Sequence, residues 1–135
     1  IPTTLSGGEF QPGGGCTDNR NKVKQSFRHP LLIPRVSILD PAPTVHTPLW
    51  VWLSTGMRAV DHATEALCSH TSNPASDASF MQALRLLSRG LPRVKAHPED
   101  LDARLDCHSR GHRMRQAMGR TACEGRAPSF FYRGE

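Results

Sequence analysis

Two side chains with complementary chemistry stand four residues apart in the middle of the chain, Arg58 and His62. Positions i and i+4 lie on one face of a helix, so a helix here presents both side chains to the same ligand. A guanidinium binds a carboxylate through two parallel hydrogen bonds, and an imidazole transfers protons near neutral pH. A structural alternative stays open, in which Arg58 pairs with Asp61 or Glu65 along the helix and His62 is a satisfied structural residue.

Residues 1–16 are rich in glycine, proline and small hydroxyl side chains, which is typical of a loop whose backbone approaches a ligand closely. Thr3, Thr4 and Ser6 carry the hydroxyls. Hydroxyls and free backbone N–H groups in a glycine-rich loop suit a diphosphate or a ribose. The same side chains also cap ordinary turns without any ligand, so the loop alone leaves both interpretations open.

Two further constellations lie near the C-terminal end. Cys107, His108, His112 and Cys123 fit no standard zinc-ligand spacing, and their segment lacks the apolar residues that support a metal site. Arginines near the aromatic cluster at residues 130–132 could bind nucleic-acid phosphates, but the aromatic rings are bunched instead of interleaved with the arginines. We therefore expect neither a zinc site nor a nucleic-acid partner.

The chain has 135 residues and a formal net charge of +5, and its two parts share that charge unevenly. Residues 1–106 carry 11 basic and 10 acidic side chains, whereas residues 107–135 carry 6 Arg and 2 Glu. Val, Ile and Leu number 22 in the first part and 0 in the second. We expect a core in the first part only, followed by an irregular basic tail whose composition is typical of a shifted reading frame in GC-rich DNA.

Cysteine usage and hydropathy indicate the compartment. The 4 cysteines have no CxxC spacing and no charged-then-apolar leader precedes them, which is typical of reduced thiols in the cytoplasm. No apolar stretch approaches the roughly 20 residues that a membrane helix needs, so we expect no membrane partner.

Local patterns predict β-structure first and helices afterwards. A strand pair turns near residues 18–21, with its second arm over residues 22–28, and a short buried strand follows over residues 35–39. A first helix begins with Thr47 as its N-cap and Pro48 in its first position.

Two further helices are predicted beyond the first. One begins at Asn73 and ends at Pro92, and the other runs from Pro98 to about Asp106 with acidic residues in its first turn. The change from β-rich to helical sequence predicts a junction between two domains. The apolar stripe of the second helix consists of Phe80, Leu84, Leu87 and Leu91.

Four segments in this order resemble the iron-containing alcohol dehydrogenase superfamily, and its maleylacetate reductase branch in particular. The resemblance covers residues 1–106. Its segments are the Pro-Thr-Thr loop within Ile1 to Glu9, Leu39-Asp40-Pro41 followed by Thr47-Pro48, the helix Ser54 to Ala66, and Leu84 to Arg93.

The resemblance implies an α/β then all-α fold of dehydroquinate synthase-like architecture, with the active site in a cleft between two domains. Residues 1–46 are then the C-terminal part of a nucleotide-binding α/β domain and residues 47–106 the start of a helical domain, with residues 107–135 as the irregular tail. The glycine-rich pyrophosphate turn of such a domain does not occur in this chain. We therefore expect a fragment of a parent enzyme that is a homodimer.

The same resemblance assigns roles to the hydroxyl loop. It implies that Thr3, Thr4 and Ser6 contact an NADH or NADPH cofactor near its nicotinamide end or its phosphates. Lys24 is implied to lie near the nicotinamide ribose.

Arg58 distinguishes the branches of the superfamily. In metal-dependent members an Asp stands four residues before the histidine that corresponds to His62, and this pair grips a divalent ion. A permanent cation in that place repels a metal, so we expect no metal. The substitution resembles the maleylacetate reductase branch, which implies that Arg58 binds a carboxylate of the substrate and that His62 has a polar or proton-transfer role in catalysis.

The resulting hypothesis is a parent enzyme that transfers hydride from NADH or NADPH to the C=C bond of maleylacetate, giving 3-oxoadipate in the breakdown of aromatic compounds. Its partner is a small-molecule dicarboxylate. One alternative is a metal-dependent alcohol dehydrogenase of the same superfamily, and another is a non-catalytic fragment. The isolated chain is expected to be inactive.

Overall fold

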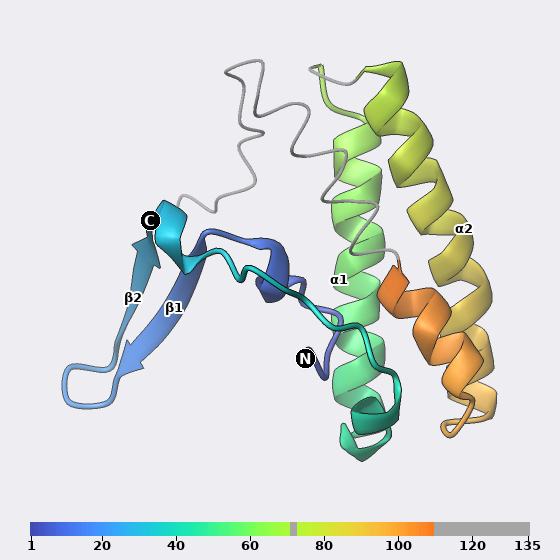
Figure 1. Cartoon of the computed structure of the whole chain (residues 1–135), viewed down its shortest axis with the longest axis horizontal. Helices are drawn as coiled ribbons and strands as arrows, with labels where there is room; N and C mark the ends of the chain where they lie inside the picture. Colours follow the sequence, from blue (N-terminus) through green and yellow to red (C-terminus); the bar gives the residue numbers. More distant parts are fainter. Residues whose placement is uncertain (71–72, 110–135) are drawn as a thin grey trace.

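The computed structural model describes residues 1–70 and 73–109. Figure 1 shows a β-hairpin on one side and helices on the other, joined by irregular segments. The predicted order of β-structure followed by helices is therefore confirmed. Most of the predicted tail, including His112 and Cys123, lies outside the described residues. Within the described part, no helix is long and apolar enough to span a membrane.

The hairpin consists of β1 (Gly13–Asp18) and β2 (Val23–Arg28), paired antiparallel with Asp18 opposite Val23 beside the turn. The turn lies where it was predicted, because Asp18 accepts hydrogen bonds from the Arg20 amide and the Asn21 side chain, both at 2.8 Å. The prediction that residues 13–15 belong to a loop was wrong. These glycines form the first half of β1, where a Cβ on Gly13 would lie 2.9 Å from the Phe27 carbonyl oxygen.

The strand predicted over residues 35–39 is not present. These residues run without regular secondary structure, and Val36 and Ile38 are 75% and 55% exposed. An apolar run of this kind is typical of a strand, but a strand also needs a hydrogen-bonded neighbour. In the described part of the chain, β1 and β2 pair only with each other. Short 3-10 turns flank the segment at Pro30–Leu32 and Ala42–His46, and a third lies at Gly8–Phe10.

The first long helix is α1 (Leu49–Leu67). The prediction that Thr47 caps it was wrong, because Pro48 occupies the N-cap position and no side chain caps the helix. The Thr47 hydroxyl instead donates a hydrogen bond to the Thr3 carbonyl oxygen at 2.8 Å. The buried face repeats every three or four residues, as in any helix with one face in a core, and consists of Trp52, Gly56, Ala59, Ala63 and Ala66.

The second helix, α2 (Pro74–Ala96), starts as predicted and ends later. Asn73 and Ser76 form a reciprocal capping box, in which the Asn73 side chain accepts a hydrogen bond from the Ser76 amide at 3.0 Å. The predicted end at Pro92 was wrong, because the helix continues through this proline for another turn. That turn buries Val94 completely, and its burial offsets the hydrogen bond that an interior proline removes.

The third helical segment covers residues 101–109. Its predicted start at Pro98 was wrong, because Asp100 caps the helix by accepting a hydrogen bond from the Ala103 amide at 2.9 Å. The segment also continues beyond Asp106 and buries Cys107 and His108.

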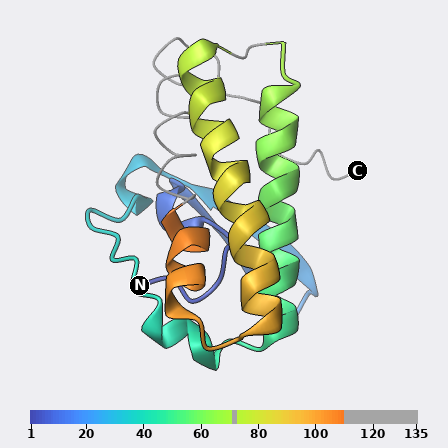
Figure 2. The same cartoon turned by 90° about the vertical axis from the view of Figure 1, so that its right-hand side faces the viewer.

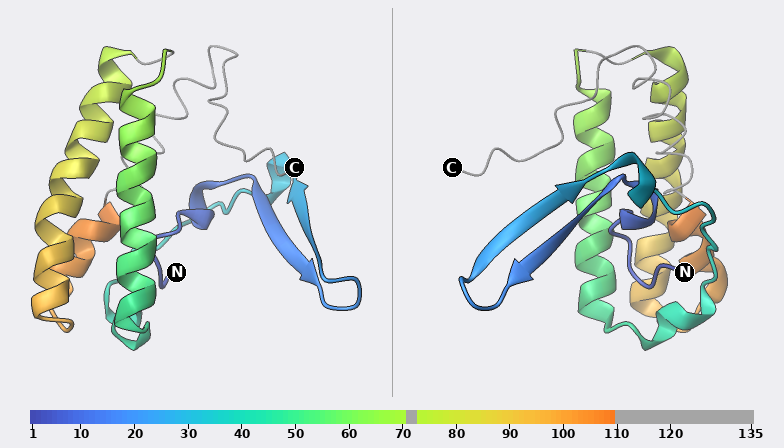
Figure 3. Two further views of the ribbon diagram at one scale, coloured as in Figure 1. Left: turned by 180° about the vertical axis from the view of Figure 1, so that it is seen from behind. Right: turned by 60° about the vertical axis from the view of Figure 1, so that its left-hand side comes forward.

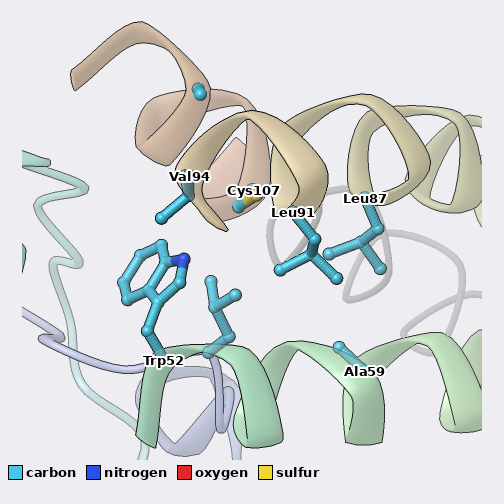
Figure 4. Packing of buried hydrophobic residues seen from close by; sticks show 8 residues of the cluster. Trp52, Ala59, Leu87, Leu91, Val94 and Cys107 are labelled. Carbon is cyan, nitrogen blue, oxygen red and sulfur yellow. The ribbon is translucent and has the colours of Figure 1, made fainter. Parts of the chain in front are cut away.

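The helices pack closely because glycines face their neighbours. α1 and α2 lie side by side, and the third segment crosses beside the lower end of α2 (Figure 2). A Cβ on Gly90 would lie 2.5 Å from the Cys107 sulfur, and a Cβ on Gly56 would lie 2.5 Å from a Leu91 methyl group. The resulting core contains Trp52, Ala59, Leu87, Leu91, Val94 and Cys107, as Figure 4 shows.

A buried arginine joins the third segment to the approach of α1. Arg104 is 1% exposed and donates hydrogen bonds to the carbonyl oxygens of Pro98 at 2.7 Å and Thr44 at 2.8 Å. Its guanidinium carbon lies 4.7 Å from the centre of the Trp52 ring, which stacks on His108 at 5.2 Å. Burial lowers the pKa of Arg104 from its usual value, but a guanidinium stays protonated at any physiological pH.

We predict that Arg104→Met lowers the free energy of unfolding by about 2–4 kcal/mol, because buried carbonyl oxygens lose a charged donor. Arg89→Met is the matched control, since Arg89 is exposed on α2. Guanidinium chloride denaturation of the 135-residue chain measures both variants. Equal losses in the two variants would contradict the structural role of Arg104.

The cap at Asp100 predicts a pH dependence of stability. The Ala103 amide, and then Arg93 at 2.8 Å, hold the pKa of Asp100 below its usual 3.8. A lowered carboxyl pKa stabilises the fold above the unfolded-state value of about 4, and this stabilisation disappears as the pH falls through the folded-state value. Asp100→Asn is therefore expected to reduce the fall in melting temperature between about pH 5 and pH 3. Arg93→Gln is expected to retain most of that fall, and the opposite ranking would refute the assignment.

Candidate active site

The predicted hydroxyl loop lies against the first half of α1. Thr3 and Ser6 are exposed and Thr4 is half-buried, and the Thr4 and Ser6 hydroxyl oxygens lie 3.0 Å apart. Figure 1 places the N-terminus beside α1, on the side that faces the hairpin. The Thr4 and Ser6 hydroxyls therefore form a small polar pair at the surface of the helical part.

Leu5 fixes this loop to the helix. Its side chain is 4% exposed and belongs to the core, and a Cβ on Gly56 would lie 3.2 Å from one of its methyl groups. Its amide donates a hydrogen bond to the Thr55 hydroxyl oxygen at 3.2 Å. With the bond from Thr47 to Thr3, the loop has backbone contacts to two positions at the start of the helical part.

Arg58 and His62 lie on α1 as predicted, one turn apart. Arg58 is exposed, and in residues 1–70 and 73–109 its guanidinium enters no ion pair with Asp61 or Glu65. The structural alternative for Arg58 is thus not observed, and its charge faces solvent. The His62 side chain is 32% exposed, and its Nδ1 lies 3.7 Å from a Glu65 carboxylate oxygen.

The residues around His62 do not fit the metal site of the metal-dependent pattern. That pattern needs a carboxylate four residues before the histidine, and the guanidinium of Arg58 has no lone pair to offer. Asp61, His62 and Glu65 bring possible ligand atoms within 4.8 Å of one another, but both carboxylates are exposed. Such a cluster on consecutive turns is common on helix surfaces, so it does not by itself define a metal site.

Lys24 lies apart from these residues. It pairs with Thr17 next to the hairpin turn, and its side chain extends over Gly15, where a Cβ would lie 3.1 Å from the lysine Cε. Figure 3 shows the turn end of the hairpin projecting away from the helices. The structure therefore brings Thr3, Thr4 and Ser6 to the helix that carries Arg58 and His62, but it does not bring Lys24 there.

Two residues near the site were given no functional role from the sequence, although Glu65 was considered as a structural partner of Arg58. Thr55 receives the loop, and Glu65 lies beside His62. Both fall on the face of α1 that carries Arg58, at spacings of three and seven residues from it, and this periodicity was a usable signal. The contact between Leu5 and Thr55 had no local signal, because the two residues are 50 positions apart.

Two curated relatives share most of the described chain. A maleylacetate reductase of Burkholderia cepacia is 39% identical over 106 residues, which cover 78% of this chain and 30% of the relative. An NAD-dependent methanol dehydrogenase of Bacillus methanolicus is 36% identical over 105 residues, covering 77% of this chain and 28% of the relative. The chain thus spans under a third of the length of these proteins.

A solved structure shares the fold. The crystal structure of maleylacetate reductase from Agrobacterium tumefaciens superposes with a TM-score of 0.74 at 32% identity, over 87% of this chain and 33% of that protein. The family model described as Fe-containing alcohol dehydrogenase family, C-terminal, matches residues 52–121, so the match reaches into the segment set apart as a tail. Because that model covers over half of the 135 residues, the chain belongs to the Fe-containing alcohol dehydrogenase family.

Proposed function

We propose that this chain supplies one wall of the active site of an NAD(P)H-dependent reductase whose substrate is maleylacetate. The observation that carries the proposal is the exposed, unpaired charge of Arg58, within the described residues, one turn before His62 on α1. The similarity to the Burkholderia cepacia maleylacetate reductase supports the same substrate. The product is 3-oxoadipate, formed by adding a hydride and a proton across the C=C bond.

Some of these residues contact the substrate and others contact the cofactor. Arg58 binds a substrate carboxylate through two hydrogen bonds, and His62 transfers the proton. Thr3, Thr4 and Ser6 hold the cofactor from the loop beside α1. The bound nicotinamide supplies the hydride.

Lys24 is assigned to the nicotinamide ribose as a separate contact. Because the hairpin turn projects away from α1, the structure does not bring Lys24 to the hydroxyl loop, and this contact rests on the resemblance to the family alone. The cofactor is NADH or NADPH, the parent enzyme is a cytoplasmic homodimer, and neither a metal nor a nucleic acid takes part.

A metal-dependent alcohol dehydrogenase is the second candidate. It is favoured by the 36% identity to the NAD-dependent methanol dehydrogenase of Bacillus methanolicus. Arg58 argues against it, since a fixed positive charge repels a divalent ion from the position that an acidic ligand would need. The third possibility is a non-catalytic chain.

The reaction is tested in a hybrid enzyme. Residues 1–106 replace the matching segment of the Burkholderia cepacia maleylacetate reductase, and oxidation of NADH and NADPH is followed by the loss of absorbance of the reduced nicotinamide. We expect turnover with maleylacetate that EDTA does not abolish. Turnover of simple aldehydes that requires added iron or zinc would favour the second candidate, and a folded hybrid without any turnover would favour the non-catalytic chain. The 135-residue chain alone is expected to be inactive.

In the same hybrid, Arg58→Gln is expected to raise the KM for maleylacetate about ten- to a hundredfold, because a charged hydrogen-bond donor to the carboxylate is lost. Arg58→Lys is expected to recover only part of this, since an ammonium cannot bind both carboxylate oxygens in a fixed plane. Arg85→Gln, at an exposed position of α2, is the control. An unchanged KM in Arg58→Gln would remove Arg58 from the substrate site.

A further inference from the structure

The Thr55 hydroxyl connects the hydroxyl loop to the helix that carries Arg58. It donates a hydrogen bond within α1 to the Val51 carbonyl oxygen at 2.9 Å. Its oxygen also accepts a hydrogen bond from the Leu5 amide at 3.2 Å, across 50 positions of sequence. A hydroxyl can donate one hydrogen bond and accept others, so both contacts are satisfied at once.

Thr64, on the same helix, shows which of the two Thr55 hydrogen bonds is specific to Thr55. The Thr64 hydroxyl donates to the Val60 carbonyl oxygen at 2.9 Å, which reproduces the bond from Thr55 to Val51 within the helix. Thr64 is exposed near the other end of α1, far along the helix from the loop. The bond to Val51 is therefore an ordinary helix feature, whereas the bond from Leu5 is specific to Thr55.

We propose that Thr55 is a positioning residue for the cofactor, which holds the Thr3–Ser6 loop at a set place relative to Arg58. This inference rests on the proposed function, because it takes the loop as the cofactor contact and Arg58 as the substrate contact. Thr55 itself touches neither ligand. It acts through the backbone of Leu5, whose neighbours in sequence, Thr4 and Ser6, carry the hydroxyls.

The geometry explains why the place of the loop matters. Thr55 precedes Arg58 by three residues, so both lie on one face of one rigid helix. Hydride transfer requires the reacting atoms to approach to about 3–3.5 Å, and small displacements of a bound partner cost rate. Because the loop is fixed to the helix one turn from Arg58, the cofactor and the substrate are held at a set position relative to each other.

Two other contacts hold the same loop and limit how far it can move. The Leu5 side chain lies beside Gly56 in the core cluster that also contains Leu91, and the Thr47 hydroxyl donates a hydrogen bond to the Thr3 carbonyl oxygen at 2.8 Å. Loss of the Thr55 contact alone is thus expected to loosen the loop while the core remains folded.

The first test uses the 135-residue chain. Thr55→Val keeps the shape of the side chain and removes the acceptor, so the Leu5 amide is expected to exchange its hydrogen about three- to tenfold faster by NMR. Thr64→Val is the matched control and is expected to leave the Leu5 amide unchanged. Equal exchange rates of Leu5 in the two variants would overturn the inference before any enzyme is assayed.

The second test uses the hybrid enzyme with NADH as the probe. Thr55→Val is expected to raise the KM and the Kd for NADH about three- to tenfold, whereas Thr55→Ser, which retains the acceptor, changes them less than about twofold. The melting temperature is expected to fall no further in Thr55→Val than in Thr64→Val. If NADH affinity is the same in both valine variants, Thr55 has a structural role only.

The outcomes separate this inference from the proposed function. If the hybrid reduces maleylacetate and Thr55→Val leaves its KM and Kd for NADH unchanged, the positioning role is refuted and the proposed function stands. A hybrid that does not reduce maleylacetate refutes the function, while NADH binding and Leu5 exchange still decide whether Thr55 positions the loop. If Thr55→Val does not give folded protein, Thr47→Val takes its place, since it releases the same loop at Thr3 and is expected to weaken NADH binding in the same direction.

Discussion

The absence of a side chain at Gly56 is the constraint on which the arrangement of the site depends. A Cβ there would meet a Leu91 methyl group at 2.5 Å and a Leu5 methyl group at 3.2 Å. The glycine thus lets α2 approach α1 on one side and lets the hydroxyl loop dock beside it. Because Thr55 and Arg58 flank this position on the same helix, the close packing that forms the core also sets where the loop lies relative to Arg58.

Periodic patterns in the sequence were enough to locate the helices and the helical side of the site. The apolar stripe of α2, the cap at Asn73 and the turn after Asp18 are local features, and the structure contains all three. Arg58 and His62 share a helix face for the same reason. Residue roles in catalysis rest on the resemblance to the family and stay predictions, because spacing alone does not identify a substrate.

Three of the wrong predictions share a cause, which is that distant contacts outweighed local preferences. Pro92 is a strong local stop, but the burial of Val94 in the core carries α2 through it. Thr47 is a good local cap, but its hydroxyl bonds to Thr3 instead. Residues 35–39 have the composition of a strand and no strand beside them within the described chain. No window of neighbouring residues contains this information.

Arg104 links Thr44 to Pro98 through hydrogen bonds. This link determines where the molecule can bend. It joins the entrance of α1 to the end of α2, so these two segments rotate together as one body. Among the residues that the structure describes, two irregular segments connect the hairpin to this body, and the Ser37 hydroxyl links them by donating a hydrogen bond to the Glu9 carbonyl oxygen at 3.2 Å. A hinge in these segments would swing Lys24 toward or away from α1 without opening the core, as closure of a cleft over a cofactor demands.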